Sequence, residues 1–359
     1  KEDYSEWFAK QLLQGKTPDV FMILSNDFNQ LASLGVMKNL DELIHRDQAF
    51  STEEYFSTTL LSGEYRGIQY ALPYETVPTL MFVNKTLLEK EGIAVPDSDW
   101  TWEDLYHICK IITKDLDGDG RLDQFGTYNY DWQDAVFTNG TILFDEYDMK
   151  INLANDKVIN AVKYTKQLYE LNQGQKVTQE DFDSGKVAFM PLPFSDYRTY
   201  KTYPYKIKKY LNFQWDCITL PAGENGGNIS EVNTLLMGIS DKTKNEKLAW
   251  EFLKLLTYDK EIQMDIFRYS QGASVLKEVT RSKEAEVILQ EYMEESEKVI
   301  DNELLSRVIE QGTIAPKILK YKEAVAIATS EIQGIIENDK NIDSSLKILQ
   351  RKINQYLKQ

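Results

Sequence analysis

A helix, a glycine and a strand follow one another at the start of the chain and constrain its fold class. Residues 4–14 have the apolar spacing of an amphipathic helix, Gly15 ends it, and an unbroken apolar run occupies residues 20–24. A short apolar run that follows turn residues predicts a buried strand. Helices and strands in this alternation are typical of an α/β layer, so we expect an α/β fold.

The length and continuity of the chain predict two lobes. With 359 residues, the chain is longer than one hydrophobic core usually serves. It contains no internal repeat and no low-complexity linker. Two lobes without a linker imply that the chain crosses between them several times, and we expect crossings near residues 76–79, 230–233 and 284.

Local patterns place the other elements. Residues 65–72 and 79–83 predict short strands around a turn at Pro73-Tyr74-Glu75. Thr101, with Asp104 three positions later, has the spacing of a capping box and predicts a helix start. The remaining expected elements are helices at 156–171 and 243–256, strands at 186–190, 213–220 and 233–239, and an almost wholly helical tail from about residue 284.

Composition limits the partners of the chain. The net charge is −16, which disfavours nucleic acid and anionic membrane surfaces because both are bound through basic patches. The 21 tyrosines and six tryptophans supply flat, amphipathic rings. Such rings suit sugar faces and protein cores equally well.

Cysteine and histidine give little support for catalysis. Cys109 lies on an apolar helical stripe and is interpreted as a buried thiol, although one disulfide with Cys217 stays open. The only histidines are His45 and His107. Because no metalloprotease, serine-hydrolase, phosphate-loop or cysteine–histidine motif is present, triad and metal-hydrolase chemistry are disfavoured.

The segment from Gly63 to Leu105 carries the most specific motif. Its positions, in order, are Gly67, Tyr70, Leu72, Pro73, Asn84, Lys85, Gly92, Pro96, Thr101, Trp102, Glu103 and Leu105. This series resembles a signature of sugar-type solute-binding proteins of ABC importers, the maltose-binding-protein-like family. Segments 14–23, 31–44, 182–190 and 244–257 resemble further motifs of that family, and the resemblance extends from about residue 6 to the end of the chain.

The resemblance implies a fold and a division into lobes. The fold is a two-lobed, periplasmic-binding-protein-like α/β fold of type II, with discontinuous lobes joined by a hinge and a helical C-terminal tail. The expected N-lobe comprises residues 1–77 and 232–283, and the expected C-lobe comprises residues 78–231 and 284–359. The family normally has a further strand and a secretion signal upstream, so we expect the natural protein to be longer.

The resemblance also implies a function. Proteins of this type are receptors, not enzymes, and they capture a carbohydrate by hinge closure and deliver it to an ABC permease in the membrane. We expect an oligosaccharide ligand, no required cofactor and a monomeric protein. We expect it outside the cytoplasm, as a lipid-anchored protein of a Gram-positive cell surface rather than a periplasmic protein.

Candidate ligand contacts follow from the chemistry of sugars. Their hydroxyl groups and apolar ring faces call for carboxylates or amides beside aromatic rings. The resemblance places such groups in the cleft at Asp27, Tyr74, Glu75, Trp132, Phe194, Asn233 and Gln271, with Asn26, Asn139, Asp196, Glu231 and Tyr269 as weaker candidates. Structural alternatives stay open, because Asp27 can cap a helix, Glu75 can cap a strand and Trp132 can belong to the core. We expect a few of these residues to line one cleft.

A group of aspartates forms the metal-binding pattern of the sequence. Its members are Asp115, Asp117, Asp119 and Asp123. With Gly120 at the sixth position, their spacing is that of a calcium loop. Position 12 is Gly126 rather than the usual glutamate, which Asp123 at position 9 can replace in part. Two interpretations stay open: a structural calcium site remote from the cleft, and a solvated acidic turn.

Two other functions stay open. The first is a carbohydrate hydrolase with paired carboxylates, for which acidic residues are plentiful but no motif selects a pair. The second is a receptor for a peptide or a polyamine, which the aromatic content and the sugar-type signature disfavour. Turnover of an oligosaccharide would favour the enzyme, whereas stoichiometric binding without turnover would favour the receptor.

Overall fold

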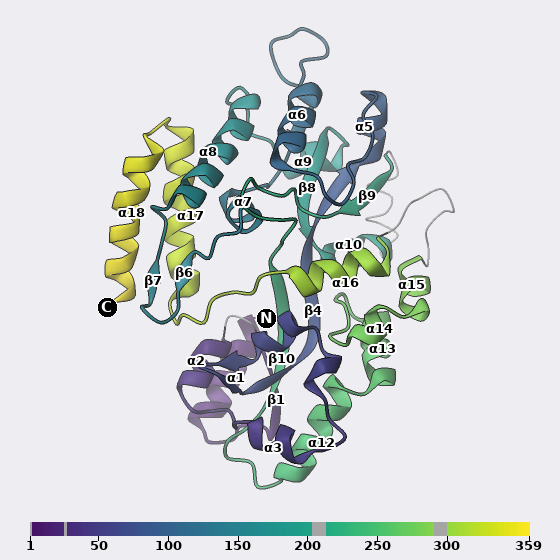
Figure 1. Cartoon of the computed structure of the whole chain (residues 1–359), viewed down its shortest axis with the longest axis vertical. Coiled ribbons are helices and arrows are strands. Elements are labelled where there is room, and N and C mark those ends of the chain that lie inside the picture. Colours follow the sequence, from purple (N-terminus) through teal and green to yellow (C-terminus); the bar gives the residue numbers. More distant parts are fainter. Residues whose placement is uncertain (1, 25–26, 203–212, 291–299) are drawn as a thin grey trace. The chain divides into compact units, whose positions relative to one another are not determined.

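The chain folds into two compact units, which are described separately. A computed structural model describes residues 2–24, 27–202, 213–290 and 300–359 (Figure 1). Unit 1 contains Lys1–Pro78, Val232–Ile288 and Leu305–Leu319, and unit 2 contains Thr79–Glu231, Leu289–Leu304 and Lys320–Gln359. The chain therefore passes between the units at 78/79, 231/232, 288/289, 304/305 and 319/320.

The division into units differs from the expected lobes in the tail. The sequence-based expectation assigns the whole segment 284–359 to the second lobe, but Leu305–Leu319 belongs to unit 1. There the hydroxyl of Thr58 donates to the carbonyl of Glu310 (2.9 Å). An apolar helical stripe predicts a helix, but it does not say which core the helix joins, so the expected boundary at 284 was wrong for this segment.

Unit 1 is built on three strands, in the order β1 (Val20–Ile23), β10 (Val232–Ile239) and β4 (Ala71–Asn84). Both pairings are antiparallel. Leu236 of β10 packs with Phe21 and Phe28, whereas its neighbour Met237 packs with Leu253. Because side chains alternate along a strand, unit 1 has one hydrophobic core on each face of its sheet.

Helices cover both faces of this sheet. The first core is covered by α1 (Glu2–Leu13) and α2 (Phe28–Ser33), and the second by α3 (Asp41–Arg46), α12 (Glu246–Thr257) and α14 (Lys277–Thr280). The other elements of unit 1 are η1 (Thr52–Glu54), α4 (Ser57–Ser62), β2 (Glu64–Tyr65), β3 (Ile68–Gln69) and α13 (Lys260–Tyr269). Helices α15 (Lys283–Gln290) and α16 (Asn302–Gln311) each span a unit boundary.

Strand β4 is longer than expected. The sequence predicts a turn at Pro73-Tyr74-Glu75, but one strand of 14 residues continues through this tripeptide. Pro73 pairs with Leu236 and Glu75 with Leu235, so Tyr74 is an extra residue without a partner on β10. Such a β-bulge lets a strand pass a proline, which cannot donate a ladder hydrogen bond. The predicted turn is therefore wrong, and β4 itself carries the chain from unit 1 into unit 2.

Unit 2 uses the second half of β4, in the strand order β5 (Phe125–Thr127), β8 (Val187–Pro193), β4 and β9 (Trp215–Ile218). Strands β8 and β9 pair with β4 in antiparallel fashion, and β5 pairs with β8 in parallel. The other elements are α5 (Lys85–Lys90), α6 (Trp102–Ile112), α7 (Trp132–Thr138), β6 (Phe144–Asp145), β7 (Lys150–Ile151), α8 (Asp156–Leu171), α9 (Gln179–Asp183), α10 (Phe194–Thr202), α17 (Tyr321–Glu337) and α18 (Ile342–Leu357).

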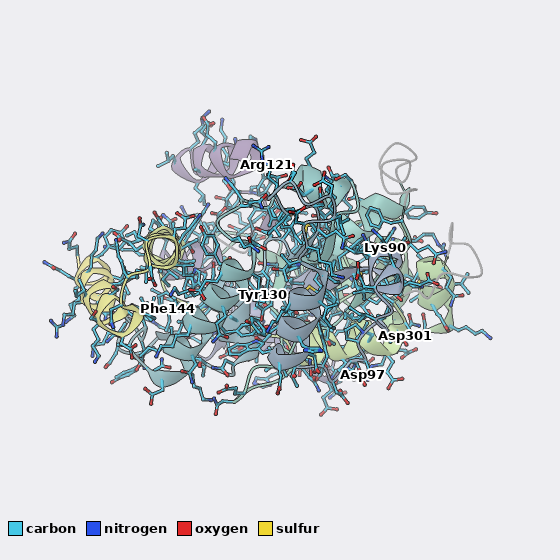
Figure 2. All side chains as sticks on the ribbon, turned by 90° about the horizontal axis from the view of Figure 1, so that it is seen from above. Lys90, Asp97, Arg121, Tyr130, Phe144 and Asp301 are labelled. Carbon is cyan, nitrogen blue, oxygen red and sulfur yellow. The ribbon has the colours of Figure 1, made fainter. Side chains whose placement is uncertain are left out.

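Three helices of unit 2 lie side by side, namely α8, α17 and α18 (Figure 1). The ring of Phe144 contacts that of Tyr321 at the start of α17, with centroids 5.1 Å apart, and Figure 2 shows Phe144 beside these helices. The ammonium of Lys166 on α8 pairs with Asp339 (2.6 Å), just beyond the end of α17. Ring contact and ion pair thus fix α17 against its neighbours.

Several local predictions are confirmed. Helix α8 covers the predicted range 156–171, and Thr101 and Asp104 form the predicted capping box at the start of α6. Cys109 is a buried thiol, as its apolar helical stripe predicts. These features depend on neighbours close in sequence, which is why spacing alone predicts them. Cys217, for which a disulfide stayed open, is a second buried thiol.

A half-buried ion pair joins two distant segments of unit 1. The carboxylate of Asp47 pairs with Lys254 and accepts the indole N–H of Trp250 (2.9 Å). The side chains of Asp47 and Lys254 are each 17% exposed. The hydrogen bond from Lys254, and then that from Trp250, hold the pKa of Asp47 below its ordinary value.

We predict that Asp47→Asn lowers the free energy of unfolding near neutral pH by about 1.5–3 kcal/mol, the usual contribution of a hydrogen bond to a charged group. The folded-state pKa is depressed, so this stabilisation exists above the unfolded-state pKa of about 3.9 and is lost as pH falls through the folded-state value. Denaturant titrations near neutral pH and in acid measure it. Glu42→Gln, in the exposed pair with Arg46, is the matched control and should change stability by at most about 0.5 kcal/mol. Equal losses in both variants would contradict the prediction.

Candidate functional site

A groove of about 350 Å³ lies within unit 2 between α8 and α17. The side chains that line it from α8 and its C-cap are Thr165, Leu168, Tyr169 and Asn172, and those from α17 are Thr329, Ile332, Gln333, Ile336 and Glu337. The spacing in both helices is i, i+3, i+4 and i+7, with Glu337 at i+8, which places each set on one helix face. The groove is therefore formed by two facing stripes of mixed apolar and polar character.

Residues 127–132, which run from the last residue of β5 through a loop to the first residue of α7, also line the groove. Among them, the ring of Tyr128 is half-exposed and those of Tyr130 and Trp132 are buried. Figure 2 shows Tyr130 among the packed side chains of unit 2. The indole N–H of Trp132 donates to the hydroxyl of Thr329 on α17 (3.1 Å). This bond joins the loop directly to the opposite wall.

The chemistry of the groove suits a hydroxyl-rich ligand with apolar faces. Tyr128 and Tyr169 offer partly exposed aromatic surface, and Asn172, Gln175 and Gln333 offer amide donors and acceptors. Aromatic rings cover apolar ligand faces, while amides bond paired hydroxyl groups. The predicted contact Trp132 lines this groove, but it is only 3% exposed, so it shapes the wall more than it offers a stacking surface.

Acidic groups gather at the start of α7. Asp131 caps the helix by accepting the N–H groups of Gln133 (2.7 Å) and Asp134 (3.2 Å). Burial, and then the charges of Asp131 and Glu231, raise the pKa of the Asp134 carboxyl well above its usual range. Burial and the charge of Asp131 likewise raise the pKa of Glu231. This end of unit 2 therefore presents carboxyl oxygens that bind protons more tightly than ordinary carboxylates.

In unit 1 the structure brings several predicted contacts onto one surface. Glu75 lies opposite Leu235 and Asn233 lies opposite Val77, so all four side chains share one face of the sheet. Asn233 is exposed and Glu75 half-exposed. We refer to Glu75, Asn233 and the nearby Gln271 as the unit 1 surface.

The segment 271–273 reaches this surface through β4. Ala273 and Thr76 exchange two backbone hydrogen bonds (2.7 and 3.0 Å), which places exposed Gln271 near Glu75. A methyl group at Gly272 would come within 2.3 Å of the Cγ and Oε1 atoms of Glu75. Glycine is thus required at this position for the present placement of the Glu75 side chain.

Two of the other predicted contacts have structural partners instead. Phe194 is fully buried and stacks on Tyr197 with centroids 5.6 Å apart, so it belongs to a core. Tyr74, the bulge residue, packs against the core that contains Leu253. Burial, and then the charge of Glu75, raise the pKa of Tyr74.

The side chain of Asp27 does not cap a helix, which was the structural alternative to its role as a ligand contact. It precedes α2 but makes no side-chain capping bond, and its carboxylate instead accepts the hydroxyl of Ser5 (2.7 Å). Among the weaker candidates, Asn139 is buried and bonded through both ends of its amide, Tyr269 is 79% exposed, Asp196 lies in the first turn of α10, and Asn26 lies outside the described residues.

Sequence analysis missed most of the groove. Tyr128, Tyr169, Thr329 and Gln333 were not among the expected contacts, because their segments are far apart in the chain. The available signal was the partly polar stripes at 165–172 and 329–336, in which one helix face mixes amides and hydroxyls with aliphatic residues. Periodicity identifies such faces but does not pair them.

Three of the four expected calcium ligands converge in the loop after α6: Asp115, Asp117 and Asp123. Each of them offers one oxygen within 4.8 Å of the other two. Asp115 also accepts the backbone N–H groups of Gly120 (2.8 Å) and Gly118 (2.7 Å), which lower its pKa. The carboxylate of the fourth, Asp119, accepts the N–H of Arg121 (2.7 Å).

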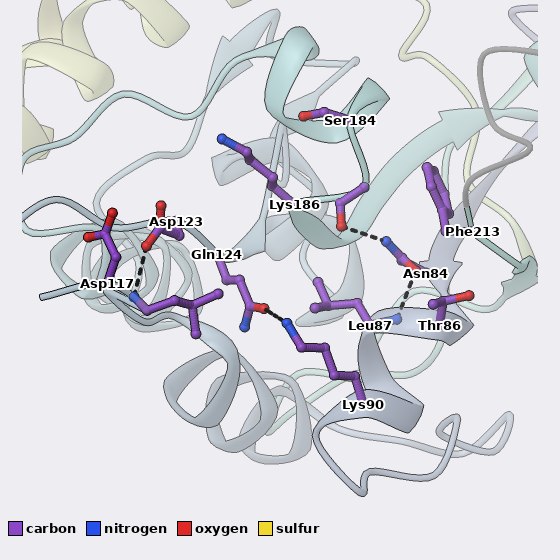
Figure 3. A pocket seen from close by; sticks show the side chains of 12 residues that line it. Asn84, Thr86, Leu87, Lys90, Asp117, Asp123, Gln124, Ser184, Lys186 and Phe213 are labelled. Atoms are coloured by element: carbon purple, nitrogen blue, oxygen red, sulfur yellow. Dashed lines mark hydrogen bonds between the residues drawn. The ribbon is translucent and has the colours of Figure 1, made fainter.

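A second cavity of unit 2, of about 440 Å³, adjoins this loop (Figure 3). Its polar walls bond to one another: Lys90 donates to Gln124 (3.0 Å), and the amide of Asn84 donates to the carbonyl of Gly185 (3.0 Å). Since these groups are already used within the protein, the groove between α8 and α17 is the better candidate for ligand binding.

Comparison with known families identifies the chain. The model of the bacterial extracellular solute-binding protein family matches residues 2–262. The chain belongs to this family. Membership confirms the resemblance found in the sequence and indicates a place outside the cytoplasm. Among the described residues, no helix is both long and apolar enough to cross a lipid bilayer.

Individual relatives are distant in sequence but similar in fold. A binding protein of Brucella abortus is 23% identical over 96% of this chain and 80% of its own length. Solved structures include an ABC substrate-binding protein of Listeria monocytogenes in complex with cycloalternan (TM-score 0.74, 18% identity, 99% and 89% of the two chains). They also include the cyclic alpha-maltosyl-1,6-maltose binding protein of Arthrobacter globiformis (TM-score 0.81, 14% identity, 99% and 89% of the two chains). These structures confirm the expected two-lobed α/β fold of type II.

Proposed function

We propose that this solute-binding protein is a carbohydrate receptor of an ABC importer, with an oligosaccharide as its ligand. The observation that carries the proposal is the groove of unit 2, whose facing stripes combine tyrosine rings with amide and hydroxyl groups. Such a mixture fits ring faces and paired hydroxyls, and the ionisable side chains of Asp131, Lys176 and Glu337 add further hydrogen-bonding groups. The sugar ligands named for the Listeria and Arthrobacter proteins support the same ligand class.

The proposed mechanism is hinge closure around the ligand. The chain passes between the units five times, at the positions given above, and several short connections are the usual elements of a hinge. The ligand favours the closed state in proportion to its additional affinity for that state. A membrane permease then recognises the closed receptor, which acts as a monomeric, lipid-anchored binding protein without catalytic turnover.

The first test is a thermal-shift screen over mono- and oligosaccharides, followed by calorimetry and X-ray scattering with the best ligand. We expect one ligand per chain, a smaller radius of gyration at saturation and no change in the recovered sugar. Cleavage of the sugar would instead support the hydrolase with paired carboxylates. Binding confined to peptides or polyamines would contradict the carbohydrate assignment, and an unchanged radius at saturation would contradict hinge closure.

We further propose that the unit 1 surface contributes ligand contacts of its own. Glu75 is the carboxylate of the unit 1 surface, and carboxylates form the strongest hydrogen bonds to sugar hydroxyls. Asn233 and Gln271 supply amides beside it. Trp132 contributes through the wall it shapes, while Asp27, Tyr74 and Phe194, which have partners of their own, are not part of this proposal.

We predict that Glu75→Gln weakens carbohydrate binding at least about tenfold, because a charge-assisted hydrogen bond contributes about 1.5–3 kcal/mol. Calorimetry measures the change in Kd. Glu261→Gln, which removes an exposed carboxylate from α13 of the same unit, is the control for the loss of one charge and should bind as wild type. Wild-type affinity in Glu75→Gln would show that the Glu75 carboxylate does not bind the ligand.

We also propose that the loop from Asp115 to Asp123 binds a structural calcium ion. The convergence of Asp115, Asp117 and Asp123 supports it, since three carboxylate oxygens within 4.8 Å of one another suit a hard cation. The ion would offset the mutual repulsion of these carboxylates and stabilise the loop after α6. The alternative is a solvated acidic turn.

Removal of calcium tests this proposal. We predict that a chelator lowers the melting temperature and that added Ca²⁺ restores it, because an ion that binds only the folded state adds RT ln(1 + [L]/Kd) to its stability. Asp123→Asn should weaken the response, whereas Asp97→Asn, outside the loop, should retain it. An unchanged melting temperature after chelation would support the solvated turn.

A further inference from the structure

The hydroxyl of Thr329 differs from those of two other helical threonines of unit 2, Thr138 and Thr165. Thr138 donates its proton to the carbonyl of Asp134 (2.9 Å), and Thr165 donates to that of Val162 (3.0 Å), so both hydroxyls are bonded within their own helices. Threonine commonly bonds the i−3 or i−4 carbonyl in this way. Among the described residues, Thr329 makes no such bond to α17.

The same hydroxyl already accepts one hydrogen bond. The indole N–H of Trp132 donates to Thr329 Oγ1 at 3.1 Å, and an indole nitrogen can only donate. Trp132 is 3% exposed, so its ring is held in place by packing on all sides. A hydroxyl has one proton to donate, and here the proton has no acceptor among the described residues.

The position of Thr329 determines where that proton can go. Thr329 is half-exposed and lines the groove on the same helix face as Ile332 and Ile336. Those two neighbours offer no acceptor. A hydroxyl proton that is not bonded to the protein therefore finds its acceptor in whatever occupies the groove.

We propose that Thr329 is a specificity-determining residue, which donates its hydroxyl proton to an acceptor oxygen of the bound ligand and is oriented for this by Trp132. The ligand oxygen is a hydroxyl, ring or glycosidic oxygen, all of which carry free lone pairs. This inference rests on the proposed carbohydrate function and assigns one ligand contact within it. Trp132 acts as a positioning residue, because it reaches the ligand through Thr329.

The test compares Thr329→Val, Thr329→Ser and Thr199→Val by calorimetry with the best oligosaccharide of the screen. Valine keeps the shape of threonine and removes the hydroxyl, and we expect Kd to rise roughly three- to tenfold, as for one neutral hydrogen bond. Serine restores the hydroxyl and should bind within about twofold of wild type. Thr199→Val, on α10 and outside the groove, removes a hydroxyl whose proton is bonded to the carbonyl of Ser195 in its own helix (2.8 Å), and it should also bind as wild type.

A double-mutant cycle separates positioning from packing. If Trp132 orients Thr329, then Trp132→Phe and Thr329→Val together should cost less affinity than the sum of their separate losses. Melting temperatures of all variants control for folding. Wild-type affinity in Thr329→Val, or an equal loss in Thr199→Val, overturns the inference and leaves the carbohydrate function intact. Absence of carbohydrate binding by the wild-type chain overturns both.

Discussion

Strand β4 is the constraint on which both units depend. Its first half pairs with β10 in unit 1, and its second half pairs with β8 and β9 in unit 2, so one uninterrupted backbone supplies ladder hydrogen bonds to two cores. The bulge at Tyr74 permits this continuity in spite of Pro73. It also leaves Glu75 on the same face as Asn233. A local irregularity of the backbone thus preserves the sheet and assembles a polar surface.

The groove of unit 2 depends on a different kind of constraint. Its walls are helices from distant parts of the chain, and they are joined by specific contacts: the ion pair of Lys166 with Asp339 and the bond from Trp132 to Thr329. The first ties α8 to the end of α17, and the second ties α7 to its middle. Side chains that face a ligand can be preorganised only if such contacts fix the helices that carry them.

This difference between a continuous strand and helices from distant segments explains which features could be predicted from the sequence. Helix α8 and the capping box of α6 were predicted correctly, because local spacing decides them. The family motif gave the fold class and indicated Glu75 and Asn233, which the sheet register brings to one face. Phe194 and the turn at Pro73 were misjudged, since burial and a bulge depend on neighbours across the sheet. Thr329 was missed because its hydrogen-bond partner, Trp132, is 197 positions away.

The carboxyl groups near the start of α7 have a consequence for any ligand that binds beside them. Asp134 and Glu231 hold their protons more tightly than ordinary carboxyls do. A ligand that bonds to their ionised forms must displace those protons, so capture releases acid and affinity weakens as the surroundings become more acidic.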